Sequence, residues 1–382
     1  MTASPVASPE GTILTPKGWV RGRVDIVDRE IATVRGDVLP AGAKPEGPFI
    51  LPGFIDLHVH GGGGADWQDG EEGIRNFVRF HTSHGTTAIA PTTATGPVRI
   101  IERALSDIAS IAEKRRPGEA VVLGAHLEGP FVSPQKPGAM NIAYMLEGDG
   151  ALAKSWAEKY KIVVATVAPE IPGGHDVGKA LAERGCRVQV GHSIATPPMV
   201  EEAFQHGFSG FTHLFNAMSQ MEHRSPGVAA YALAKARYAE IISDLVHVDE
   251  TVLLAAYRAI PRLYAITDAS AAGMPDGNYQ WGGHRIIKKG LRITLENGVT
   301  LAGSAITMLD ALRNLIKIGL TIEQASDMTS ARPAEYLGLK DLGRIEPGAR
   351  ACFVKLDHDL TLQGVWVDGE SAAPATETAQ SR

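Results

Sequence analysis

The sequence predicts an α/β fold, in which a (β/α)8 TIM-like barrel is joined to a small β-sandwich domain formed by both termini. Eight short apolar runs alternate with amphipathic helical patterns through the middle of the chain. Both ends of the chain read as strands. The glycine fingerprint that opens a doubly wound dinucleotide-binding fold is missing, so the barrel is the preferred architecture.

Strand patterns without a convincing helix occupy both ends of the chain. They are WVRGRVDIV (19–27), IATVRGDVL (31–39) and ACFVKLDHDLTLQGVWVDG (351–369), the last reading as two strands around a turn. We therefore expect residues 1–51 and 344–382 to build the small β domain and residues 52–343 to build the barrel. Residues 1–10 and 370–382 are rich in Pro, Ser and Ala, and we expect them to be frayed, leaving a flexible C-terminal tail.

Eight apolar runs in the middle region are the predicted barrel strands. They are GFIDLHVH (53–60), TTAIAPT (86–92), AVVLGAHLEG (120–129), KIVVATVAPE (161–170), RVQVGHS (187–193), FSGFTHLF (208–215), AEIISDLVH (239–247) and RLYAITDA (262–269). Helical patterns lie between most of them, among them GIRNFVRFHTSHG (73–85), DVGKALAERG (176–185), MVEEAFQHG (199–207) and ETVLLAAYRAI (250–260). The GGGG at 61–64 follows a strand but lacks the spacing of a dinucleotide loop.

The composition argues against several classes of protein, among them nucleic-acid binders and disulfide-linked secreted proteins. A net charge of -6 argues against a dedicated nucleic-acid binder, although a local site can still be basic and take an anionic substrate. Cys186 and Cys352 are far apart and lack CxxC spacing, so two free thiols in a reducing cytoplasm are expected. No signal peptide and no apolar run of membrane-spanning length is evident. A cytoplasmic enzyme or binding protein is therefore expected, with no membrane and no nucleic acid as partner.

Polar residues suited to metal or proton chemistry follow most of the predicted strands. Barrel enzymes place their catalytic groups at these strand ends, and packing alone does not explain so many of them on one rim. The residues are His58, His60, Glu128, His192, His213, His247 and Asp268.

Two imidazoles on one strand face can chelate one metal ion. His58 and His60 alternate with Val59 and so share a face, although a hydrogen-bonded polar pair is the plain alternative. Glu128, His192 and His213 strengthen the metal interpretation, because three protein ligands and water form the usual open catalytic site.

Asp268 either caps a following helix or accepts a proton from bound water. His126 is expected beside the ligands rather than among them. The ligand types suit zinc, iron, manganese or cobalt alike, so they leave the divalent metal, one or two per subunit, unidentified.

These residues sit in longer strings that resemble the amidohydrolase superfamily and, within it, the family of N-acetylglucosamine-6-phosphate deacetylases. The strings are PGFIDLHVHGGGG (52–64), HLEGPF (126–131), VGHS (190–193), THLFNAM (212–218), HRSPG (223–227), HVD (247–249), TDA (267–269), LAGS (301–304), ARPAEYLGL (331–339) and GRIEPGARA (343–351). They follow the family's order over nearly the whole chain, and HLEGPF, THLFNAM and LAGS are the specific ones.

The resemblance implies a role for each matching position. Glu128, His192 and His213 resemble the main metal ligands, His58 and His60 those of a second metal that some members keep, and Asp268 the proton shuttle. Arg224 resembles a phosphate-binding arginine lent across a homodimer interface, and the remaining substrate-contacting positions are Asn216, Ala217, His247, Leu301, Ala302 and Gly303.

One stretch departs from the family pattern. After HLEGPF the family usually has Lys-Gly-x-His-Asn, whose histidine touches the substrate, whereas here Ala139 is followed by Met140 and Asn141. Methionine cannot donate a hydrogen bond. Either the contact comes from elsewhere or the preferred substrate differs.

The reaction implied is hydrolysis of the acetamide of N-acetylglucosamine 6-phosphate, in amino-sugar catabolism and cell-wall recycling. His247 or His126 could assist the metal in stabilising the oxyanion. Three alternatives stay open: deacetylation of a related sugar such as galactosamine 6-phosphate, a cyclic amidase, and a non-catalytic binding protein. Cyclic amidases usually bridge two metals with a modified lysine, and a binding protein should have lost ligands that this chain retains.

Overall fold

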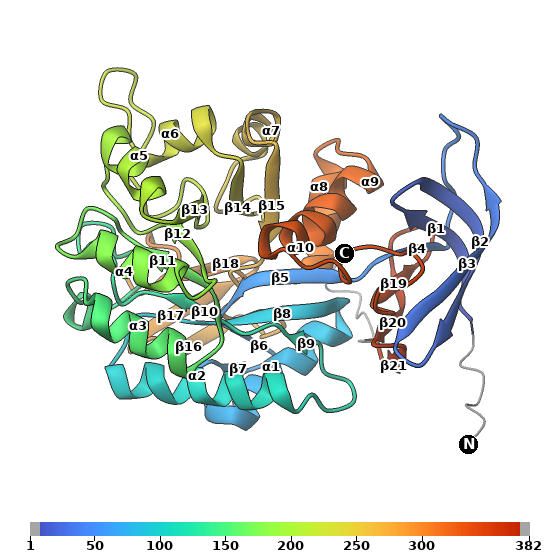
Figure 1. Cartoon of the computed structure of the whole chain (residues 1–382), viewed down its shortest axis with the longest axis horizontal. Coiled ribbons are helices and arrows are strands. Elements are labelled where there is room, and N and C mark those ends of the chain that lie inside the picture. The colour runs from blue at the N-terminus through green and yellow to red at the C-terminus, as the bar shows by residue number, and fades with distance from the viewer. Residues whose placement is uncertain (1–7, 375–382) are drawn as a thin grey trace.

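The strands from the two chain ends form one continuous seven-stranded sheet in the structure, a computed structural model that describes residues 8–374 (Figure 1). The sheet order is β21-β20-β19-β4-β1-β2-β3. Its strands are β1 (Glu10–Thr15), β2 (Gly18–Val27), β3 (Glu30–Val38), β4 (Phe49–Pro52), β19 (Phe353–Leu356), β20 (Leu362–Val367) and β21 (Glu370–Ala372). Strands β4 and β19 pair antiparallel and so join the two ends of the chain.

A small apolar core of its own holds this terminal sheet together. Ile13, Val24, Ile31 and Phe353 are fully buried in it, and Trp366 of β20 stacks on Phe353 with ring centroids 4.9 Å apart. Because β20 and β2 both contribute to the core, the sheet curves over it as a sandwich does.

The expectation that residues 370–382 are frayed is wrong at its start. Strand β21 pairs with β20, and Ala372 is buried. The reason is an Asp-Gly hairpin turn, in which Asp368 and Gly369 both have positive φ, as such turns require. At the other end β1 already begins at Glu10. Residues 1–7 and 375–382 lie outside the described part of the chain.

Eight parallel strands form the barrel, as predicted. They are β5 (Phe54–Val59), β8 (Thr86–Thr93), β10 (Ala125–Glu128), β11 (Ile162–Val167), β12 (Arg187–Val190), β13 (Phe208–Phe211), β14 (Tyr238–Ile242) and β15 (Arg262–Ile266), with β9 (Val121–Val122) added beside β8. Six pair in one ladder from β5 to β13, and β14 pairs with β15. Bonds from the strand-end loops close the two gaps: Leu214 N–H donates to Glu240 O at 2.9 Å and Asp268 N–H to His58 O at 2.8 Å.

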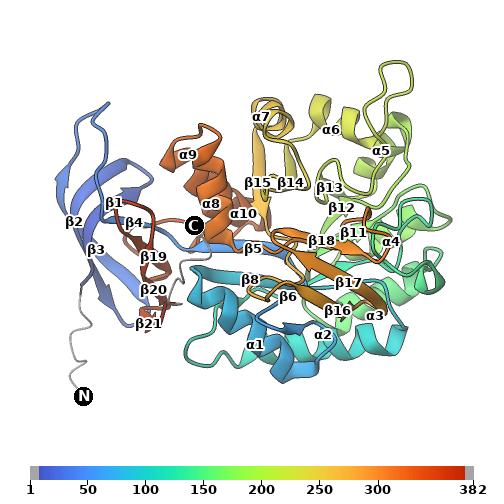
Figure 2. The ribbon, with the colours of Figure 1, turned by 180° about the vertical axis from the view of Figure 1, so that it is seen from behind.

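Helices cover the outside of the barrel (Figures 1 and 2). Those between the strands are α1 (Gly70–Ser83), α2 (Val98–Glu113), η1 (Ile142–Tyr144), α3 (Gly150–Lys159), α4 (Gly174–Ala182), α5 (Pro197–Gln205), α6 (Val228–Lys235) and α7 (Glu250–Ala259). The chain then returns to β5 and β15 through α8 (Met308–Lys317), α9 (Ile322–Ser326), η2 (Asp327–Ala331) and α10 (Arg332–Leu337). A Thr307–Asp310 capping box starts α8. No helix among residues 8–374 is long and apolar enough to cross a membrane.

Two small antiparallel sheets are inserted after barrel strands. Strands β6 (Gly61–Gly62) and β7 (Ala65–Asp66) pair just after β5. Strands β16 (Gly277–Trp281), β17 (His284–Lys289) and β18 (Arg292–Leu295) follow the last barrel strand and form a three-stranded sheet, visible across the front of Figure 2. This second sheet was not predicted from the sequence, because its strands are short and mostly polar and show little apolar periodicity.

Candidate metal centre and its pocket

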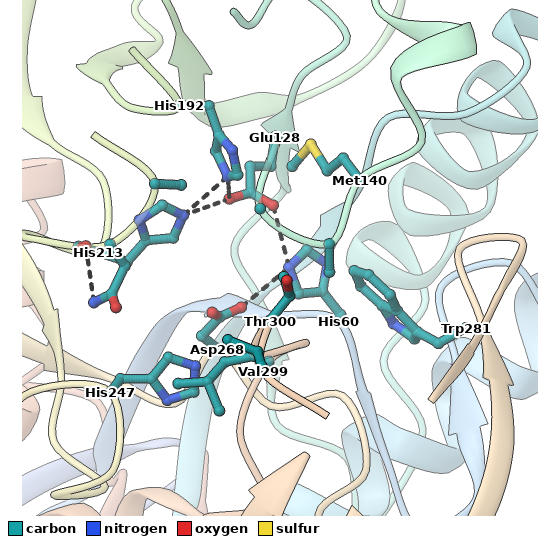
Figure 3. Close-up of a pocket in the computed structure, with 16 residues that line it drawn as sticks. His60, Glu128, Met140, His192, His213, His247, Asp268, Trp281, Val299 and Thr300 are labelled. Carbon is teal, nitrogen blue, oxygen red and sulfur yellow. Dashed lines mark hydrogen bonds and ion pairs between the residues drawn. The ribbon is translucent and has the colours of Figure 1, made fainter. Parts of the chain in front are cut away.

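A pocket of about 300 Å³ opens where the barrel strands end, and the predicted polar residues converge there (Figure 3). Parallel barrel strands all end on the same rim, so residues distant in sequence meet at this point. Its lining residues are His60, Glu128, Gly138, Ala139, Met140, His192, His213, Asn216, Ala217, His247, Asp268, Trp281, Val299, Thr300, Leu301 and Gly303.

Glu128 lies at the centre of the cluster. Its Oε1 is 3.2 Å from His192 Nε2 and 3.0 Å from His213 Nε2, and these two nitrogens are 3.1 Å apart. Its Oε2 is 3.3 Å from His60 Nε2. The carboxylate therefore stands between two pairs of histidines, and its Oε1 contacts both pairs because it is also 3.4 Å from His58 Nε2.

Asp268 faces the strand β5 histidines from the opposite side. Its Oδ1 is 3.2 Å from His60 Nε2 and 3.5 Å from His58 Nε2. No helix follows Asp268, so the alternative of a helix cap is excluded. Burial opposes the charge on Asp268, but His58 and His60 outweigh it and lower the pKa of Asp268 to about 2. The group is an ionised carboxylate at neutral pH.

Hydrogen bonds at Nδ1 orient the two imidazoles of β5. His58 Nδ1 bonds Glu240 Oε1 at 2.6 Å, and His60 Nδ1 bonds the carbonyl oxygen of Thr92 at 3.2 Å. Each bond is satisfied by a proton on Nδ1, which leaves Nε2 as a lone pair facing the centre. Glu240 also accepts the backbone N–H of His213 at 3.1 Å, so one buried carboxylate holds a residue of each histidine pair.

The loop after β10 orients His192 in the same way. His192 Nδ1 donates to the carbonyl oxygen of Lys136 at 2.8 Å, so its Nε2 also turns a lone pair toward Glu128. His213 Nδ1 is buried and has no hydrogen-bond partner among the described residues. The loop residue Gly138 lies beside the His192 ring, and a Cβ there would come within 3.1 Å of its Cε1 atom.

The donor set fits a divalent metal. Lone pairs of Glu128 and of the surrounding imidazoles face one another at 3.0–3.3 Å, which is at or slightly below the spacing of about 3.3–3.6 Å between ligands that lie ~2.0–2.2 Å from one tetrahedral ion. Acceptors in such contact need a positive charge between them. Without a bound ion, a protonated imidazole supplies that charge. Burial lowers the pKa of His60, but the carboxylates of Asp268 and Glu128 outweigh burial and raise this pKa to about 9.

Backbone strain is concentrated at this rim. His192, His213 and Asp268 have φ of +47°, +28° and +50°, in a region that side-chain-bearing residues rarely occupy. Such conformations persist when the surrounding structure determines them, and they cluster at functional sites. Here these backbone conformations direct three side chains into one pocket from the positions that follow three different strands.

His247 reaches the pocket from the loop after β14. Its Nδ1 lies 2.6 Å from Asp244 Oδ2, and Asp244 Oδ1 accepts the backbone N–H groups of Val246 and His247. Burial lowers the pKa of His247, but the bond to Asp244 outweighs it and raises the pKa above the usual value. The bond to Asp244 thus fixes the orientation of a ring that lines the pocket.

Most residues that the sequence analysis named line this pocket, and four do not. His58 is fully buried behind His60, and Ala302 is buried between the lining residues Leu301 and Gly303. Arg224 lies exposed on its loop, away from the pocket of its own chain. His126 packs its ring 4.4 Å from that of His58.

The suggestion that His126 could stabilise an oxyanion is wrong. Both of its nitrogens are engaged below the site, Nδ1 with Leu57 O at 2.9 Å and Nε2 with Thr166 Oγ1 at 2.8 Å. The side chain is fully buried and does not reach the pocket. Its place beside the ligands is as expected.

Several contributors were not predicted from the sequence; they include Val299 and Thr300 of the pocket lining, and also Glu240, Asp244 and Trp281. Glu240 and Asp244 belong to the run AEIISDLVH, where a carboxylate inside an apolar strand and one three residues before a histidine were available signals. Trp281 lies on the unpredicted three-stranded sheet and sets its ring edge-on to His60, with centroids 5.4 Å apart. Only the fold brings that sheet to the pocket.

A family model described as Amidohydrolase family matches residues 49–372. The chain belongs to the amidohydrolase family. Similar proteins cover almost its whole length. An N-acetylglucosamine-6-phosphate deacetylase of Lysinibacillus sphaericus is 38% identical over 88% of this chain and 89% of that protein. An N-acetylgalactosamine-6-phosphate deacetylase of Escherichia coli O157:H7 is 34% identical over 94% and 97%.

Solved structures of this family superpose closely. An N-acetylglucosamine-6-phosphate deacetylase from Pasteurella multocida has a TM-score of 0.87 at 27% identity, covering 95% of this chain and 98% of that one. A mutant of the corresponding Mycobacterium smegmatis enzyme, in complex with N-acetyl-D-glucosamine-6-phosphate, also has a TM-score of 0.87, at 30% identity over 94% and 97%. A D-hydantoinase shares the fold at 17% identity, with a TM-score of 0.62.

Proposed function

We propose that this chain hydrolyses the N-acetyl group of N-acetylglucosamine 6-phosphate, giving glucosamine 6-phosphate and acetate. The observation that carries the proposal is the meeting of Glu128, His192, His213 and Asp268 in one pocket, in a chain that matches deacetylases of this substrate along nearly its full length. The reaction would belong to amino-sugar catabolism and cell-wall recycling. The buried free cysteines suit a reducing cytoplasm.

Glu128, His192 and His213 would hold one divalent ion, and His58 and His60 a second, with Glu128 between them. The candidate clusters and the Nδ1 hydrogen bonds described above support both assignments. When bound, such an ion polarises the amide carbonyl and lowers the pKa of its water from 15.7 to about 7. A directly available carboxylate at Glu128 distinguishes the chain from cyclic amidases that depend on a modified lysine.

Asp268 would move the proton that the reaction transfers. Its ionised carboxylate takes a proton from the attacking water at Oδ and later gives it to the amine nitrogen as the carbon–nitrogen bond breaks. Water and amide then balance to acetic acid and free amine, with Asp268 returned to its carboxylate form, and at neutral pH the acid gives its proton to the amine or to solvent. The position of Asp268 against His60, at the floor of the pocket, supports this role.

The two sides of the pocket suit the two ends of the substrate. In Figure 3, His213 and His247 lie on one side of Glu128 and His60, and Met140 and Trp281 lie on the other. We assign the sugar phosphate to the first side, with His247, Asn216 and Ala217, and the pocket segment Leu301–Gly303 beside the sugar. The acetyl methyl group then meets the apolar pair Met140 and Trp281.

Met140 cannot supply the hydrogen bond that the family's histidine gives. Its sulfur instead accepts a bond from Thr95 Oγ1 at 3.0 Å, which fixes the side chain as part of the apolar wall. Ala139, next to it, is also buried at the pocket edge. This wall is a reason to expect the acetyl group, rather than a polar acyl group, on this side.

Arg224 would complete the site of a neighbouring subunit. Its guanidinium can hold a phosphate in a bidentate fork, and its exposure outside its own pocket fits a role across a symmetric homodimer interface.

The test is acetate release from a panel of substrates by the metal-loaded enzyme. N-acetylglucosamine 6-phosphate should give the highest kcat/KM, and the unphosphorylated sugar should be at least about tenfold poorer because a charge-assisted phosphate contact is lost. N-acetylgalactosamine 6-phosphate and a cyclic amide complete the panel. A preference for either of these, or equal turnover of metal-free enzyme, would overturn the proposal.

A further inference from the structure

We propose that Ser304 is a positioning residue for Asp268, an inference that rests on the function proposed above. Ser304 is fully buried and directly follows the segment Leu301–Gly303 at the pocket. It does not line the pocket itself. Hydrogen bonds of its side chain and of its backbone hold the residues around Asp268, so Ser304 would act on the reaction only through Asp268.

Three hydrogen bonds join Ser304 to the chain around Asp268. Its Oγ donates to the carbonyl oxygen of Thr267 at 2.6 Å. Its backbone N–H donates to the carbonyl oxygen of Asp268 at 2.8 Å, and its carbonyl oxygen accepts the N–H of Ser270 at 3.0 Å. Because Thr267 is fully buried, its carbonyl oxygen would lose this hydrogen bond without gaining water if the Ser304 hydroxyl were removed.

Asp268 depends on such support because its backbone conformation is unfavourable. Its φ of +50° lies in a region that side-chain-bearing residues rarely occupy. Conformations of this kind persist only when the surrounding structure determines them. The N–H of Asp268 is held by His58 O at 2.8 Å, and its carbonyl oxygen is held by Ser304. Asp268 therefore spans from β5 to the loop that carries Ser304.

Thr267, the residue before Asp268, is held by the same two segments. Its Oγ1 donates to Asp56 Oδ2 of β5 at 2.6 Å, and its N–H donates to Asp56 Oδ1 at 3.3 Å. Its carbonyl oxygen is the group that Ser304 Oγ holds. Loss of the Ser304 hydroxyl would therefore leave Thr267 tied to β5 but free to rotate its carbonyl, and the strained residue that follows would move with it.

The loop that carries Ser304 also packs against Asp268 where it lines the pocket. Gly303 has a φ of +71°, and a Cβ there would come within 2.8 Å of the Asp268 carbonyl oxygen and 2.7 Å of Ser270 Oγ. Ser270 Oγ in turn donates to the carbonyl oxygen of Ala302 at 2.7 Å. The pocket wall and Asp268 are thus directly packed on each other.

The pocket wall has a second support that does not involve Ser304. The N–H of Ala302 donates to the carbonyl oxygen of Ile293 in β18 at 3.1 Å, and Leu301 forms a β-bridge with Thr294 of the same strand. Removal of the Ser304 hydroxyl should therefore leave the wall beside the substrate in place. The expected defect is in turnover rather than in substrate binding.

The experiment compares four versions of the metal-loaded enzyme: wild type, Ser304→Ala, Ser304→Cys and Ser330→Ala. Ser330 is the matched control, because it is equally buried and its Oγ also donates to a backbone carbonyl, that of Pro52 at 3.1 Å, outside the pocket. Cysteine fills the space of the serine, but its S–H is a weak donor. The cysteine variant therefore separates loss of the hydrogen bond from loss of volume.

Both Ser304 variants should lower kcat by about 10–100-fold, the loss expected when a reacting group is misplaced by about 1 Å. KM and metal content should stay near those of wild type, because the wall and the metal ligands are untouched. Ser330→Ala should lower the Tm through loss of a buried hydrogen bond and keep the wild-type kcat. Wild-type kcat in either Ser304 variant, or equal losses in Ser304→Ala and Ser330→Ala, would overturn the proposal.

Crystal structures of the four versions give a readout that does not depend on activity. Asp268 Oδ1 lies 3.2 Å from His60 Nε2 here, and in both Ser304 variants it should move by about 1 Å relative to wild type. It should stay in place in Ser330→Ala. If wild type releases no acetate, the proposed function fails, whereas this comparison still tests whether Ser304 holds Asp268. An unmoved Asp268 in the Ser304 variants would overturn the positioning role.

Discussion

Individual polar side chains inside apolar strands carry most of the chemistry of this protein. Glu128, Glu240 and Asp268 are buried carboxylates at barrel strands or their ends, where an isolated charge is costly. Each is compensated by imidazoles within 2.6–3.3 Å. These contacts offset the free-energy cost of burying the carboxylates, and they hold the carboxylate and imidazole groups in a fixed arrangement.

Replacing Asp268 by asparagine should separate proton transfer from binding. The substitution keeps the shape of the side chain but removes its ability to accept and return a proton. We expect kcat to fall by about 10²–10⁴-fold, while elemental analysis still finds the ion held by Glu128, His192 and His213. A loss of less than about tenfold would assign Asp268 a positioning function instead.

Glu240→Gln should weaken metal binding at His58 and His60. The amide can donate a hydrogen bond to His58 Nδ1 and so turn the wrong tautomer toward the centre. We expect the metal affinity of this position to drop by about 10–100-fold, measured as metal content after dialysis against a chelator.

Glu119→Gln is the matched control for Glu240→Gln. Glu119 is equally buried but pairs with Arg75 on another part of the barrel. It should lower the Tm and leave metal content unchanged. Equal metal loss in the two variants would show a general effect of unfolding and not of orientation.

At the scale of elements, the barrel strands position the metal cluster and the inserted sheet β16–β18 shapes the pocket. Strand ends supply groups from β5, β10 and β15 and from loops after β12, β13 and β14. The inserted sheet adds Trp281, which is buried against His60. The groups of the candidate metal centre therefore lie at strand ends and in the loops directly after them, and a separate element adds Trp281 to the pocket wall.

Trp281→Ala should lower kcat/KM without removing metal. The ring edge against His60 and the wall beside Met140 are both lost. An aromatic contact of this kind contributes ~0.5–1.5 kcal/mol, which corresponds to a loss of up to about tenfold. Trp281→Phe keeps an aromatic ring and should recover most of the activity. Unchanged kcat/KM in the alanine variant would place the acyl group elsewhere.

At the scale of the whole molecule, one chain does not bring every predicted group to its pocket. Arg224 is exposed on the loop between β13 and α6, while the other candidate substrate contacts lie in or next to the pocket. The exposure of Arg224 outside its own pocket is the observation behind the proposal that this loop acts in the site of a second copy of the chain. The terminal sheet, with its own core, contributes no side chain to the pocket lining.

Mixing Arg224→Ala with Asp268→Asn should restore activity if the clamp crosses between subunits. Each variant alone has every site damaged, whereas a hybrid dimer has one site with both residues intact. Arg224→Ala by itself should raise KM for the phosphorylated sugar and hardly affect the unphosphorylated one. Subunit exchange without recovery of activity, or equal effects on both sugars, would show that the clamp is not shared.

Local sequence patterns are enough to predict the barrel strands and the residue types of the candidate site. Short runs rich in apolar and β-branched residues, such as TTAIAPT (86–92), predict buried parallel strands, and His58, Glu128 and Asp268 stand at the ends of such runs. The alternation of His58 and His60 places both on one face because side chains alternate along a strand. These are local properties, and local spacing is enough to read them.

Tertiary structure alone decided which of these groups meet and in which state. Glu128 touches histidines 64 and 85 positions away, and Glu240 holds His58 across 182 positions. The orientation of His126 away from the pocket and the position of β16–β18 beside the pocket also depend on tertiary structure. Both are set by contacts with segments that are distant in the sequence. Spacing along a chain fixes the face of a strand, whereas hydrogen-bond partners and burial are fixed only when distant segments fold together.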